Sequence, residues 1–440
     1  MMYFDRKWYL NQLIAKKNNA LIKVITGARR SGKSYLMNQI FYGSLLKDGV
    51  KEKNIIRFAF DNDEHLDLLD SFYPEEKTKI NVGKDAYVVN SKKFRAYIKS
   101  VTNDTEKFYL LLDEIQLLES FVGTLNGFLS HDNFDVYVTG SNSQLLSSEI
   151  ETKFRGRKSS IHLLPLSFSE FVSGSQLSPD LAWKKYLVTG GIPIVYQQKE
   201  EDRESYLMDL CQETYLKDII GRKHVKDGDT LSDLFGVLAS CVGSGVSPSS
   251  LEKAFRARKS VSVSDDTIAT YIHHFEDAFV VSIANKYNIK GRAYINTPFK
   301  VYFEDIGVRN ARTNFSQIEE THLMENIIYN ELRYRGFHVS VGEVDVNEMT
   351  DRIDINGKKI YKQKSLEVDF IATKGNQKYY IQSCLNMNDE ETLKREKRSL
   401  HAINDSFEKI IVTKNGLDAF IDENGYRIID IFDFLLNPPF

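Results

Sequence analysis

The stretch Gly27-Ala-Arg-Arg-Ser-Gly-Lys33-Ser34 directly follows an apolar run at residues 21–26. A strand, a loop framed by two glycines and a Lys-Ser pair at a helix start together form the phosphate-binding P-loop. Backbone N–H groups of such a loop point inward at phosphate oxygens, and the helix that begins at Lys33 adds its positive dipole end. The sequence therefore predicts a nucleotide site at residues 27–34.

Individual residues of this loop have distinct expected roles. Lys33 is expected to reach the β- and γ-phosphates, and Ser34 to place its hydroxyl on Mg²⁺. The complete set expected to bind the nucleotide is Gly27, Arg30, Gly32, Lys33, Ser34 and Tyr35.

A second apolar run, at residues 108–112, ends in Asp113 and Glu114. A continuous apolar run is typical of a parallel strand that is buried on both faces. Asp113 at its carboxyl end is expected to hold Mg²⁺, directly or through water, and Glu114 to orient and deprotonate the attacking water.

A third strand is predicted at residues 134–139, and it runs into Gly140-Ser-Asn-Ser143. A polar side chain at this strand tip is expected to touch the γ-phosphate or the attacking water. Asn142 is the first candidate and Ser141 the second, although these residue types are also ordinary in turns.

The chain resembles AAA+-type P-loop ATPases of a prokaryotic group in which the ATPase is fused to a C-terminal domain with a restriction-endonuclease-like core. The resemblance covers nearly the whole chain. Besides the P-loop, Leu110-Leu-Leu-Asp-Glu-Ile-Gln116 and Thr139-Gly-Ser-Asn-Ser143, it rests on Phe154-Arg-Gly-Arg157, Leu164-Pro-Leu-Ser-Phe-Ser-Glu-Phe171, Gly190-Gly-Ile-Pro193, Tyr302-Phe-Glu-Asp-Ile-Gly307, Glu325-Asn-Ile-Ile-Tyr-Asn-Glu-Leu332 and Glu367-Val-Asp-Phe370.

The resemblance implies two further roles. Arg155 and Arg157 match the segment that supplies an arginine finger to a neighbouring subunit, and Arg157 is the stronger candidate. Gly191-Ile-Pro193 matches a lid element whose proline packs on adenine, so Pro193 is expected to contact the nucleotide. A plain Gly-Pro turn is the alternative for this element.

Composition describes an ordinary globular chain of about three domains, with 440 residues, 42% hydrophobic residues and 27% charged residues. The net charge of −3 gives no global basicity, so any nucleic-acid binding must come from a local patch. Three widely spaced cysteines, Cys211, Cys241 and Cys384, argue against a disulfide framework or zinc site and favour a reducing cytoplasm. No signal core and no membrane-spanning run are expected.

The predicted fold class is α/β, with four parts. Residues 1–165 alternate strands and helices, which indicates a mainly parallel sheet. Residues 166–228 form a helical lid, residues 229–300 a winged-helix-like module, and residues 301–440 a second α/β domain of endonuclease-like type.

The winged-helix-like module carries the compact basic cluster Arg256, Arg258 and Lys259. One interpretation is DNA binding, with a helix in the major groove and the basic residues on phosphates. The other is packing within the chain or against a protein partner, because a fold does not determine a function.

The C-terminal domain resembles an endonuclease core with Glu325 on a helix and Asp369 on a strand. The next strand has Gln382-Ser-Cys384 where that family has Glu-x-Lys, so both a carboxylate and a lysine are missing. Lys394 is a candidate substitute for the lysine. We expect this domain to be degenerate, and residues 345–365 to form a charged loop or an extra hairpin.

Together these features predict a cytoplasmic, Mg²⁺-dependent ATPase of AAA+ type that acts as a switch or remodeler on DNA, in a homo-oligomer. The alternatives are a signalling ATPase whose C-terminal half binds proteins, and an ATP-coupled nuclease. The sequence does not specify the substrate, the pathway or the number of subunits.

Overall fold

The computed structural model describes residues 2–83, 86–140, 154, 156–223, 225, 227–259, 263–353, 359–387 and 390–437. The chain divides into two compact units. The N-terminal unit contains residues 3–165 and 277–279, and the C-terminal unit contains residues 166–276 and 280–440. Each unit is described by itself below.

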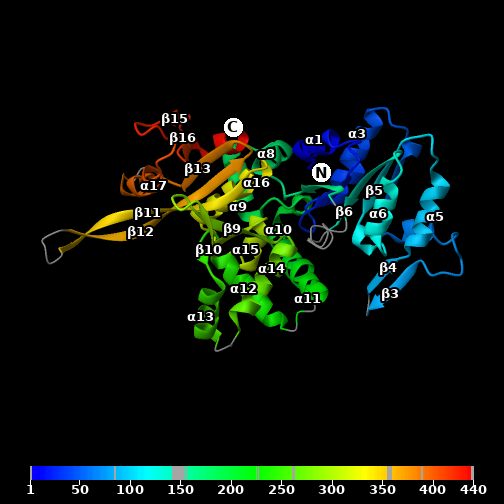
Figure 1. The fold of residues 1–440 in the computed structure, drawn as a ribbon, viewed down its shortest axis with the longest axis horizontal. Helices are drawn as coiled ribbons and strands as arrows, with labels where there is room; N and C mark the ends of the chain where they lie inside the picture. Colours follow the sequence, from blue (N-terminus) through cyan, green and yellow to red (C-terminus); the bar gives the residue numbers. More distant parts are fainter. Residues whose placement is uncertain are drawn as a thin grey trace. The chain divides into compact units, whose positions relative to one another are not determined.

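The N-terminal unit is built on a five-stranded parallel sheet with the order β2-β5-β6-β1-β7 (Figure 1). The apolar runs of the sequence form its central strands as predicted, and all five residues of β1 are buried. The strands are β1 (Ile22–Thr26), β2 (Ile55–Ala59), β5 (Phe108–Asp113), β6 (Phe134–Thr139) and β7 (Lys158–His162).

Helices cover this sheet, and a separate two-stranded sheet lies apart from it. The long helix after the P-loop is α2 (Lys33–Tyr35), the π-helical segment η1 (Leu36–Phe41) and α3 (Tyr42–Lys47) in succession. The remaining elements are α1 (Lys7–Ala15), η2 (Glu52–Asn54), α4 (Asp63–Asp67), β3 (Lys79–Gly83), β4 (Ala86–Val89), α5 (Ser91–Val101), η3 (Ile115–Leu117) and α6 (Phe121–Leu129).

The strand order brings three loops to one edge of the sheet. Strand β6 lies between β1 and β5, with Val138 paired to both Val24 and Leu112. All three strands are parallel, so their carboxyl ends share one edge. The loop after Thr26, the acidic pair after β5 and Thr139 therefore lie close together.

A buried ion pair supports the middle of the sheet. The ammonium of Lys23 on β1 donates to Asp135 on β6, and the Tyr137 hydroxyl donates to the same carboxylate at 2.9 Å. A buried charge is tolerated only when it is paired and hydrogen-bonded, so this contact ties β1 to β6.

The C-terminal unit begins with helices, as predicted for residues 166–228. They are α8 (Phe168–Ser175), α9 (Pro179–Thr189), η5 (Pro193–Gln197), η6 (Glu200–Asp202), α10 (Arg203–Asp209), η7 (Leu210–Leu216) and α11 (Lys217–Lys223). Ser167 caps α8 in a reciprocal capping box with Glu170.

The rest of this unit is organised on a nine-stranded sheet with the order β15-β16-β14-β13-β12-β11-β9-β10-β8. Its strands are β8 (Gly245–Val246), β9 (Val281–Asn288), β10 (Ala293–Phe303), β11 (His338–Ile353), β12 (Lys359–Lys374), β13 (Gln377–Cys384), β14 (Glu408–Thr413), β15 (Phe420–Ile421) and β16 (Arg427–Asp430). The helices are α12 (Gly228–Ser240), α13 (Pro248–Lys259), α14 (Asp265–Asp277), α15 (Ile306–Arg312), α16 (Glu320–Tyr334), α17 (Glu390–His401) and α18 (Ile431–Leu436).

The sheet is continuous across the boundary predicted at residue 300. Strand β10 spans that boundary, and β9 pairs in parallel with β11 through Tyr287 and Gly342. The helices and short strands of residues 228–303 therefore share one hydrogen-bonded sheet with the C-terminal α/β region.

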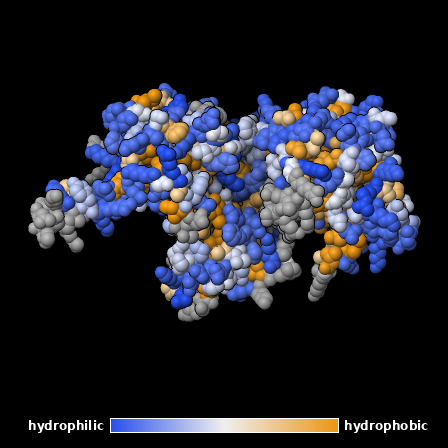
Figure 2. All heavy atoms as spheres, in the orientation of Figure 1, coloured by the Kyte–Doolittle hydropathy of each residue, from blue (hydrophilic) through white to orange (hydrophobic). Residues whose placement is uncertain are grey.

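Strands β11 and β12 extend from this sheet as a long antiparallel arm (Figure 1), in which Asp345 pairs with Ser365. Of the two alternatives for residues 345–365, a charged loop or an extra hairpin, the paired strands correspond to the hairpin. The charged residues of this segment give the arm a mainly hydrophilic surface (Figure 2), which allows two long strands to remain exposed to water.

Candidate functional site

The loop between β1 and α2 has the backbone geometry that its glycines predict. Gly27 and Gly32 adopt φ angles of 145° and 98°, and Arg30 between them adopts 65°. A Cβ atom at Gly27 would lie 2.2 Å from the carbonyl oxygen of Leu163, so only glycine fits there. The loop thus turns tightly enough to return the chain to the start of the helix at Lys33.

The side chain of Lys33 lies inside this turn. Its ammonium is buried and donates to the carbonyl oxygens of Gly27 at 2.9 Å and of Ala28 at 2.8 Å. Ser31 is also buried, and within the described part of the chain its Oγ atom has no hydrogen-bond partner. The loop therefore presents a cation held by neutral acceptors beside a buried hydroxyl in need of a partner.

Asp113 ends β5 at the same edge of the sheet. Its carboxylate accepts hydrogen bonds from Thr139 Oγ1, at the end of β6, and from the side-chain amide of Asn38 at 3.4 Å. Burial raises the pKa of Asp113, while the hydroxyls of Thr139 and Ser34 and the charge of Lys33 oppose the rise. The two residues predicted to hold Mg²⁺, Ser34 and Asp113, therefore lie near each other at this edge of the sheet.

Glu114 follows in a left-handed conformation, with φ of 52°, and its N–H donates to Thr139 Oγ1 at 3.3 Å. Its carboxylate accepts a hydrogen bond from the side chain of Gln116. The Thr139 hydroxyl therefore contacts both members of the acidic pair: it donates to the carboxylate of Asp113 and accepts from the backbone N–H of Glu114.

A third acid, Asp61, lies near this pair and was not predicted from the sequence. Burial raises its pKa, and the charges of Glu114 and Asp113 raise it further. Asp61 follows β2, which pairs with β5 in parallel, so only the strand order brings it to this edge. Its position after the short, mainly apolar stretch at residues 55–60 is the sole local signal, and that signal is weak.

The structure brings together most of the predicted P-loop and acidic residues, but not every candidate can be placed. Arg30 and Tyr35 are exposed at the loop and the helix start. Ser141, Asn142 and Arg155 lie outside the described residues.

Arg157 lies at the opposite edge of the sheet from the P-loop. Its carbonyl accepts the N–H of Ile22 at 2.9 Å, at the amino ends of β1 and β7. The five residues of β1 separate it from Gly27 by roughly 15 Å at the usual rise per residue. An exposed Arg157 at that edge cannot reach the P-loop of its own chain.

Pro193 begins η5 in the C-terminal unit, with Ile192 between it and the glycine pair Gly190 and Gly191. The N–H of Gly191 donates to the buried carboxylate of Asp305 at 2.6 Å, and a Cβ atom at Gly190 would collide with that carboxylate. Burial raises the pKa of Asp305 to about 6, although backbone N–H groups oppose the rise. Packing of Gly190 against Asp305, and of Gly191 against the backbone of Leu166, is thus a sufficient reason for the two glycines, and contact of Pro193 with adenine remains a prediction.

The predicted basic cluster on α13 is described in part. Arg256 is exposed and paired with Glu252 one turn earlier on the helix. The side chains of Arg258 and Lys259 lie outside the described part of the structure.

The residues of the N-terminal site fit a nucleotide with Mg²⁺. The buried hydroxyl of Ser31 has no partner in the described chain, and the ammonium of Lys33 is held inside the turn by two carbonyl oxygens, which phosphate oxygens can replace. The Ser34 hydroxyl and the Asp113 carboxylate are hard oxygen ligands, the kind that Mg²⁺ prefers.

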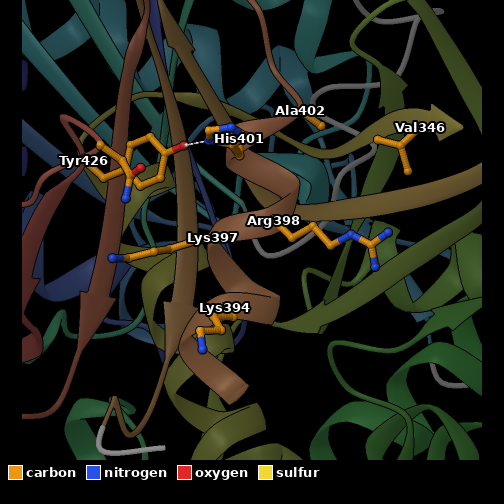
Figure 3. Close-up of a pocket in the computed structure, with 8 residues that line it drawn as sticks. Val346, Lys394, Lys397, Arg398, His401, Ala402 and Tyr426 are labelled. Atoms are coloured by element: carbon orange, nitrogen blue, oxygen red, sulfur yellow. Dashed lines mark hydrogen bonds between the residues drawn. The ribbon is translucent and has the colours of Figure 1, made fainter. Parts of the chain in front are cut away.

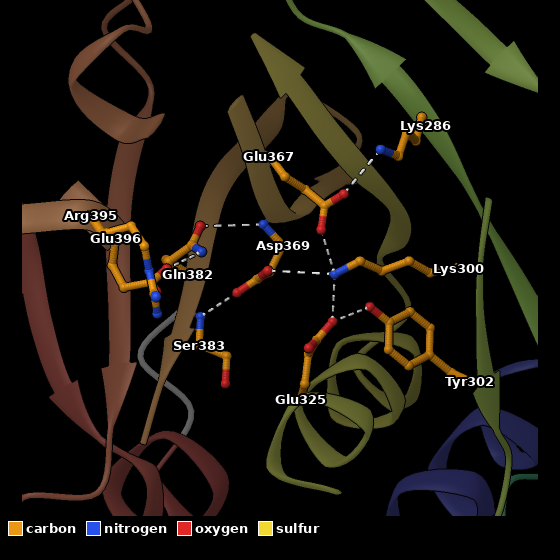
Figure 4. A network of polar contacts seen from close by, with 10 residues as sticks. All are labelled: Lys286, Lys300, Tyr302, Glu325, Glu367, Asp369, Gln382, Ser383, Arg395 and Glu396. Carbon is orange, nitrogen blue, oxygen red and sulfur yellow. Dashed lines mark hydrogen bonds and ion pairs between the residues drawn. The ribbon is translucent and has the colours of Figure 1, made fainter. Parts of the chain in front are cut away.

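A second polar cluster lies in the C-terminal unit, and Lys300 of β10 is at its centre (Figure 4). Its ammonium lies 2.8 Å from Glu325 on α16, 2.7 Å from Glu367 and 3.6 Å from Asp369, both on β12. Tyr302 donates to the same Glu325 oxygen at 2.6 Å. This lysine was not predicted as a member of the cluster.

The charges of this cluster are buried and mutually neutralised. Burial opposes the charge of Lys300, but Glu325, Asp369 and Glu367 outweigh that effect and raise its pKa. Burial, and next the charge of Glu325, raises the pKa of Asp369 to about 8. The ammonium thus occupies the centre of the carboxylates, where a metal would have to bind.

Gln382 also has partners in the folded chain. Its side-chain amide donates to Glu396 on α17 at 2.6 Å, and its oxygen accepts the N–H of Asp369 at 3.3 Å. Among the residues that the structure describes, no three His, Cys, Asp or Glu side chains are grouped so that they could hold a metal ion.

Comparisons with known proteins agree with the geometry of the N-terminal site. Residues 19–172 match the AAA domain family, and residues 180–319 match a domain of unknown function (DUF8612). An uncharacterized protein of Haemophilus influenzae is 31% identical over 438 residues, which cover 98% of each chain. The chain belongs to the same protein family as the Haemophilus influenzae protein. An uncharacterized protein of Methanocaldococcus jannaschii is 25% identical, with 94% of this chain and 87% of that protein covered.

Similar solved structures include Cdc6p from Pyrobaculum aerophilum, with 12% identity, a TM-score of 0.31, and 74% of this chain and 94% of that chain covered. The Aeropyrum pernix ORC1 protein in complex with DNA has 11% identity, a TM-score of 0.32, and 71% and 92% covered. Across the described residues of this AAA-domain protein, no helix has the length and apolar character that crossing a membrane requires.

We predict that Lys300→Met lowers the free energy of unfolding of the C-terminal unit by about 3–5 kcal/mol at pH 7.5, because it leaves buried carboxylates without a counter-charge. The loss becomes smaller as the pH falls toward 5: against the effect of burial, Lys300 lowers the pKa of Glu367, and the stability from this pairing is lost as Glu367 takes up a proton. Urea unfolding is followed by tryptophan fluorescence in a Trp8→Phe background. The signal then reports on this unit, because Trp183 lies in it and is the remaining tryptophan of the two in the sequence.

Lys199→Met, at an exposed lysine of the same unit, is the matched control and should be neutral. Equal stability of Lys300→Met and wild type would contradict a buried, neutralised cluster. An Mn²⁺-dependent stabilisation of the wild-type unit would contradict occupation of the carboxylates by the ammonium.

Proposed function

We propose that the chain binds ATP with Mg²⁺ and hydrolyses it at the carboxyl edge of the N-terminal sheet. The observation that carries this proposal is the buried ammonium of Lys33 inside the P-loop turn, with Ser34 and the Asp113 carboxylate near it at the same edge of the sheet. This is the set of groups that a triphosphate and its metal require: backbone donors, one cation, and two hard oxygen ligands. The AAA domain match at residues 19–172 supports the same assignment.

Each residue has a proposed task in this reaction. Lys33 exchanges its carbonyl acceptors for phosphate oxygens, which are charged and therefore stronger acceptors. Ser34 and Asp113 would hold Mg²⁺, which when bound neutralises phosphate charge. Glu114 accepts a proton from the attacking water, and Thr139 keeps Glu114 and Asp113 in place.

We further propose that Arg157 completes the site of a neighbouring copy. Its place at the amino edge of the sheet excludes action on its own P-loop, whereas transition-state charge at the γ-phosphate benefits from an external cation. This role requires a homo-oligomer. Asn142 at the tip of β6 and Pro193 on the adenine remain proposals of the same kind.

We propose that ATP hydrolysis drives a conformational switch that acts on DNA. The candidate phosphate contacts are the exposed Arg256 of α13, Arg258 and Lys259. A signalling ATPase that binds protein partners is the competing proposal. The neutralised cluster around Lys300 supports an endonuclease-like C-terminal region that does not cut, because catalytic metal binding needs carboxylates that are free to coordinate.

We predict that Lys33→Ala weakens ATP binding by about 10- to 150-fold, since a charge-assisted hydrogen bond contributes about 1.5–3 kcal/mol. Titration calorimetry with Mg²⁺ and ATP measures the change. Lys47→Ala, at an exposed lysine at the end of the same helical segment, is the control. Wild-type affinity and turnover in Lys33→Ala would rule out the P-loop assignment.

Glu114→Gln should bind ATP as wild type does and lower kcat by about 10²–10⁴-fold, because the amide cannot accept the proton of the attacking water. Phosphate release under saturating ATP measures kcat, with the exposed Glu119→Gln as control. If binding and turnover disappear together, Glu114 is instead a structural residue or a metal ligand.

Mixing Arg157→Ala with Lys33→Ala subunits should restore part of the activity that each variant lacks alone, because one intact P-loop can then face one intact arginine. Phosphate release across a series of mixing ratios measures the rescue. Absence of rescue, combined with a monomeric mass by light scattering in ATP and Mg²⁺, would contradict a shared site.

A further inference from the structure

A hollow of about 360 Å³ lies in the C-terminal unit, away from the Lys300 cluster, between the turn that joins β9 to β10 and the segment before β14. The turn contributes Lys290 and Arg292, β13 contributes Lys378, and the segment before β14 contributes Asp405 and Phe407. Of these three cations, Lys290 donates to the carbonyl oxygen of Asp345 outside the lining, so Lys378 and Arg292 are the two that share Asp405 as the carboxylate of the hollow.

The positive charge of this hollow is incompletely neutralised. The ammonium of Lys378 lies 3.9 Å from Asp405, and the same Asp405 oxygen already accepts the Tyr380 hydroxyl at 2.6 Å. Burial lowers the pKa of Lys378, and the nearby charge of Arg292 lowers it further, although Asp405 opposes both effects. An anion placed between Lys378 and Arg292 would relieve this repulsion.

Aromatic rings line the same hollow. Lys378 lies 5.0 Å from the ring centroid of Phe407 and 5.9 Å from that of Tyr287. Phe407 is 42% exposed, so one part of its ring is available for stacking. Cations beside an exposed ring suit a ligand that joins a phosphate to a flat base.

A second hollow with a basic wall lies next to the first one, because Ile403 lines the first hollow and Ala402 lines the second. The wall of the second hollow along α17 is formed by Lys394, Lys397, Arg398 and His401 (Figure 3). These four positions recur at helical spacing, so they form one face of α17. Two of these cations have acidic partners beyond the lining: Lys397 lies 2.7 Å from Asp422, and Arg398 is paired with Glu348. The volume of the hollow is about 460 Å³.

We propose that the first hollow binds one nucleotide unit of a single-stranded nucleic acid, with its phosphate on Lys378 and Arg292 and its base on Phe407. The strand continues along this face of α17, where backbone phosphates compete with Asp422 and Glu348 for Lys397 and Arg398. This site is separate from the ATP site and from Arg256, and it extends the proposal that the chain acts on DNA.

The test measures fluorescence anisotropy of 5′-fluorescein-labelled dT15 with the full chain, in excess ADP and Mg²⁺ so that the P-loop is saturated. We expect Phe407→Ala to weaken binding by about 5- to 150-fold, the loss typical of one stacked base. Phe407→Tyr keeps a ring and should retain binding. Arg292→Gln and Lys378→Gln should each reduce the slope of log affinity against log salt by about 0.7.

Lys199→Gln removes one exposed charge elsewhere in the unit and should leave dT15 binding unchanged. Competition with thymidine monophosphate distinguishes a free nucleotide from a strand as the ligand. If thymidine monophosphate competes with dT15 at low millimolar concentration, one nucleotide suffices; if it does not compete, a strand is needed. Both results support the site when Phe407→Ala abolishes the signal.

The proposal is overturned if wild type binds neither probe, if Phe407→Ala binds dT15 as wild type does, or if Arg256→Gln alone removes binding. Phosphate release from ATP, measured on the same variants, tests the ATPase proposal separately. Normal release with no dT15 binding would refute the hollow alone, and dT15 binding without release would refute the ATPase alone.

Discussion

The buried ammonium of Lys33 is the constraint on which the N-terminal site depends. An ammonium in the interior must be surrounded by oxygen acceptors, and the turn at residues 27–33 provides them through the carbonyls of Gly27 and Ala28. Two other buried lysines meet the same requirement differently: Lys23 is paired with Asp135, and Lys300 with Glu325 and Glu367. Carboxylate partners complete a charge pair, whereas carbonyl acceptors are weaker and can be exchanged for phosphate.

The sequence was sufficient to predict the elements of this site because each has a local signal. Gly27, Gly32 and the Lys33-Ser34 pair are contiguous, and Asp113 and Glu114 end an apolar run. The structure adds the residues that join the site only because of the order of the strands in the sheet. Thr139 and Asp61 reach the acidic pair only because β6 and β2 lie on either side of β5, and strand order leaves no trace in a local pattern.

The C-terminal unit shows the same division between local and long-range information. The helix with Glu325, the strand with Asp369 and the next strand with Gln382 were predicted, and they are present as α16, β12 and β13. The parallel pairing of β9 with β11 was not predicted, because nothing in either strand specifies its neighbour. That pairing places β10 in the same sheet as β12, so Lys300 comes to lie among carboxylates that were predicted without it.

The most direct measurement of the central claim is release of inorganic phosphate from ATP by the purified wild-type chain, in Mg²⁺ and in excess EDTA, with and without single-stranded DNA. The account predicts release that requires Mg²⁺ and saturates with ATP, because the triphosphate and metal complete the contacts of Lys33, Ser34 and Asp113. Absence of Mg²⁺-dependent release in all of these conditions, from protein that is folded by circular dichroism, would contradict it.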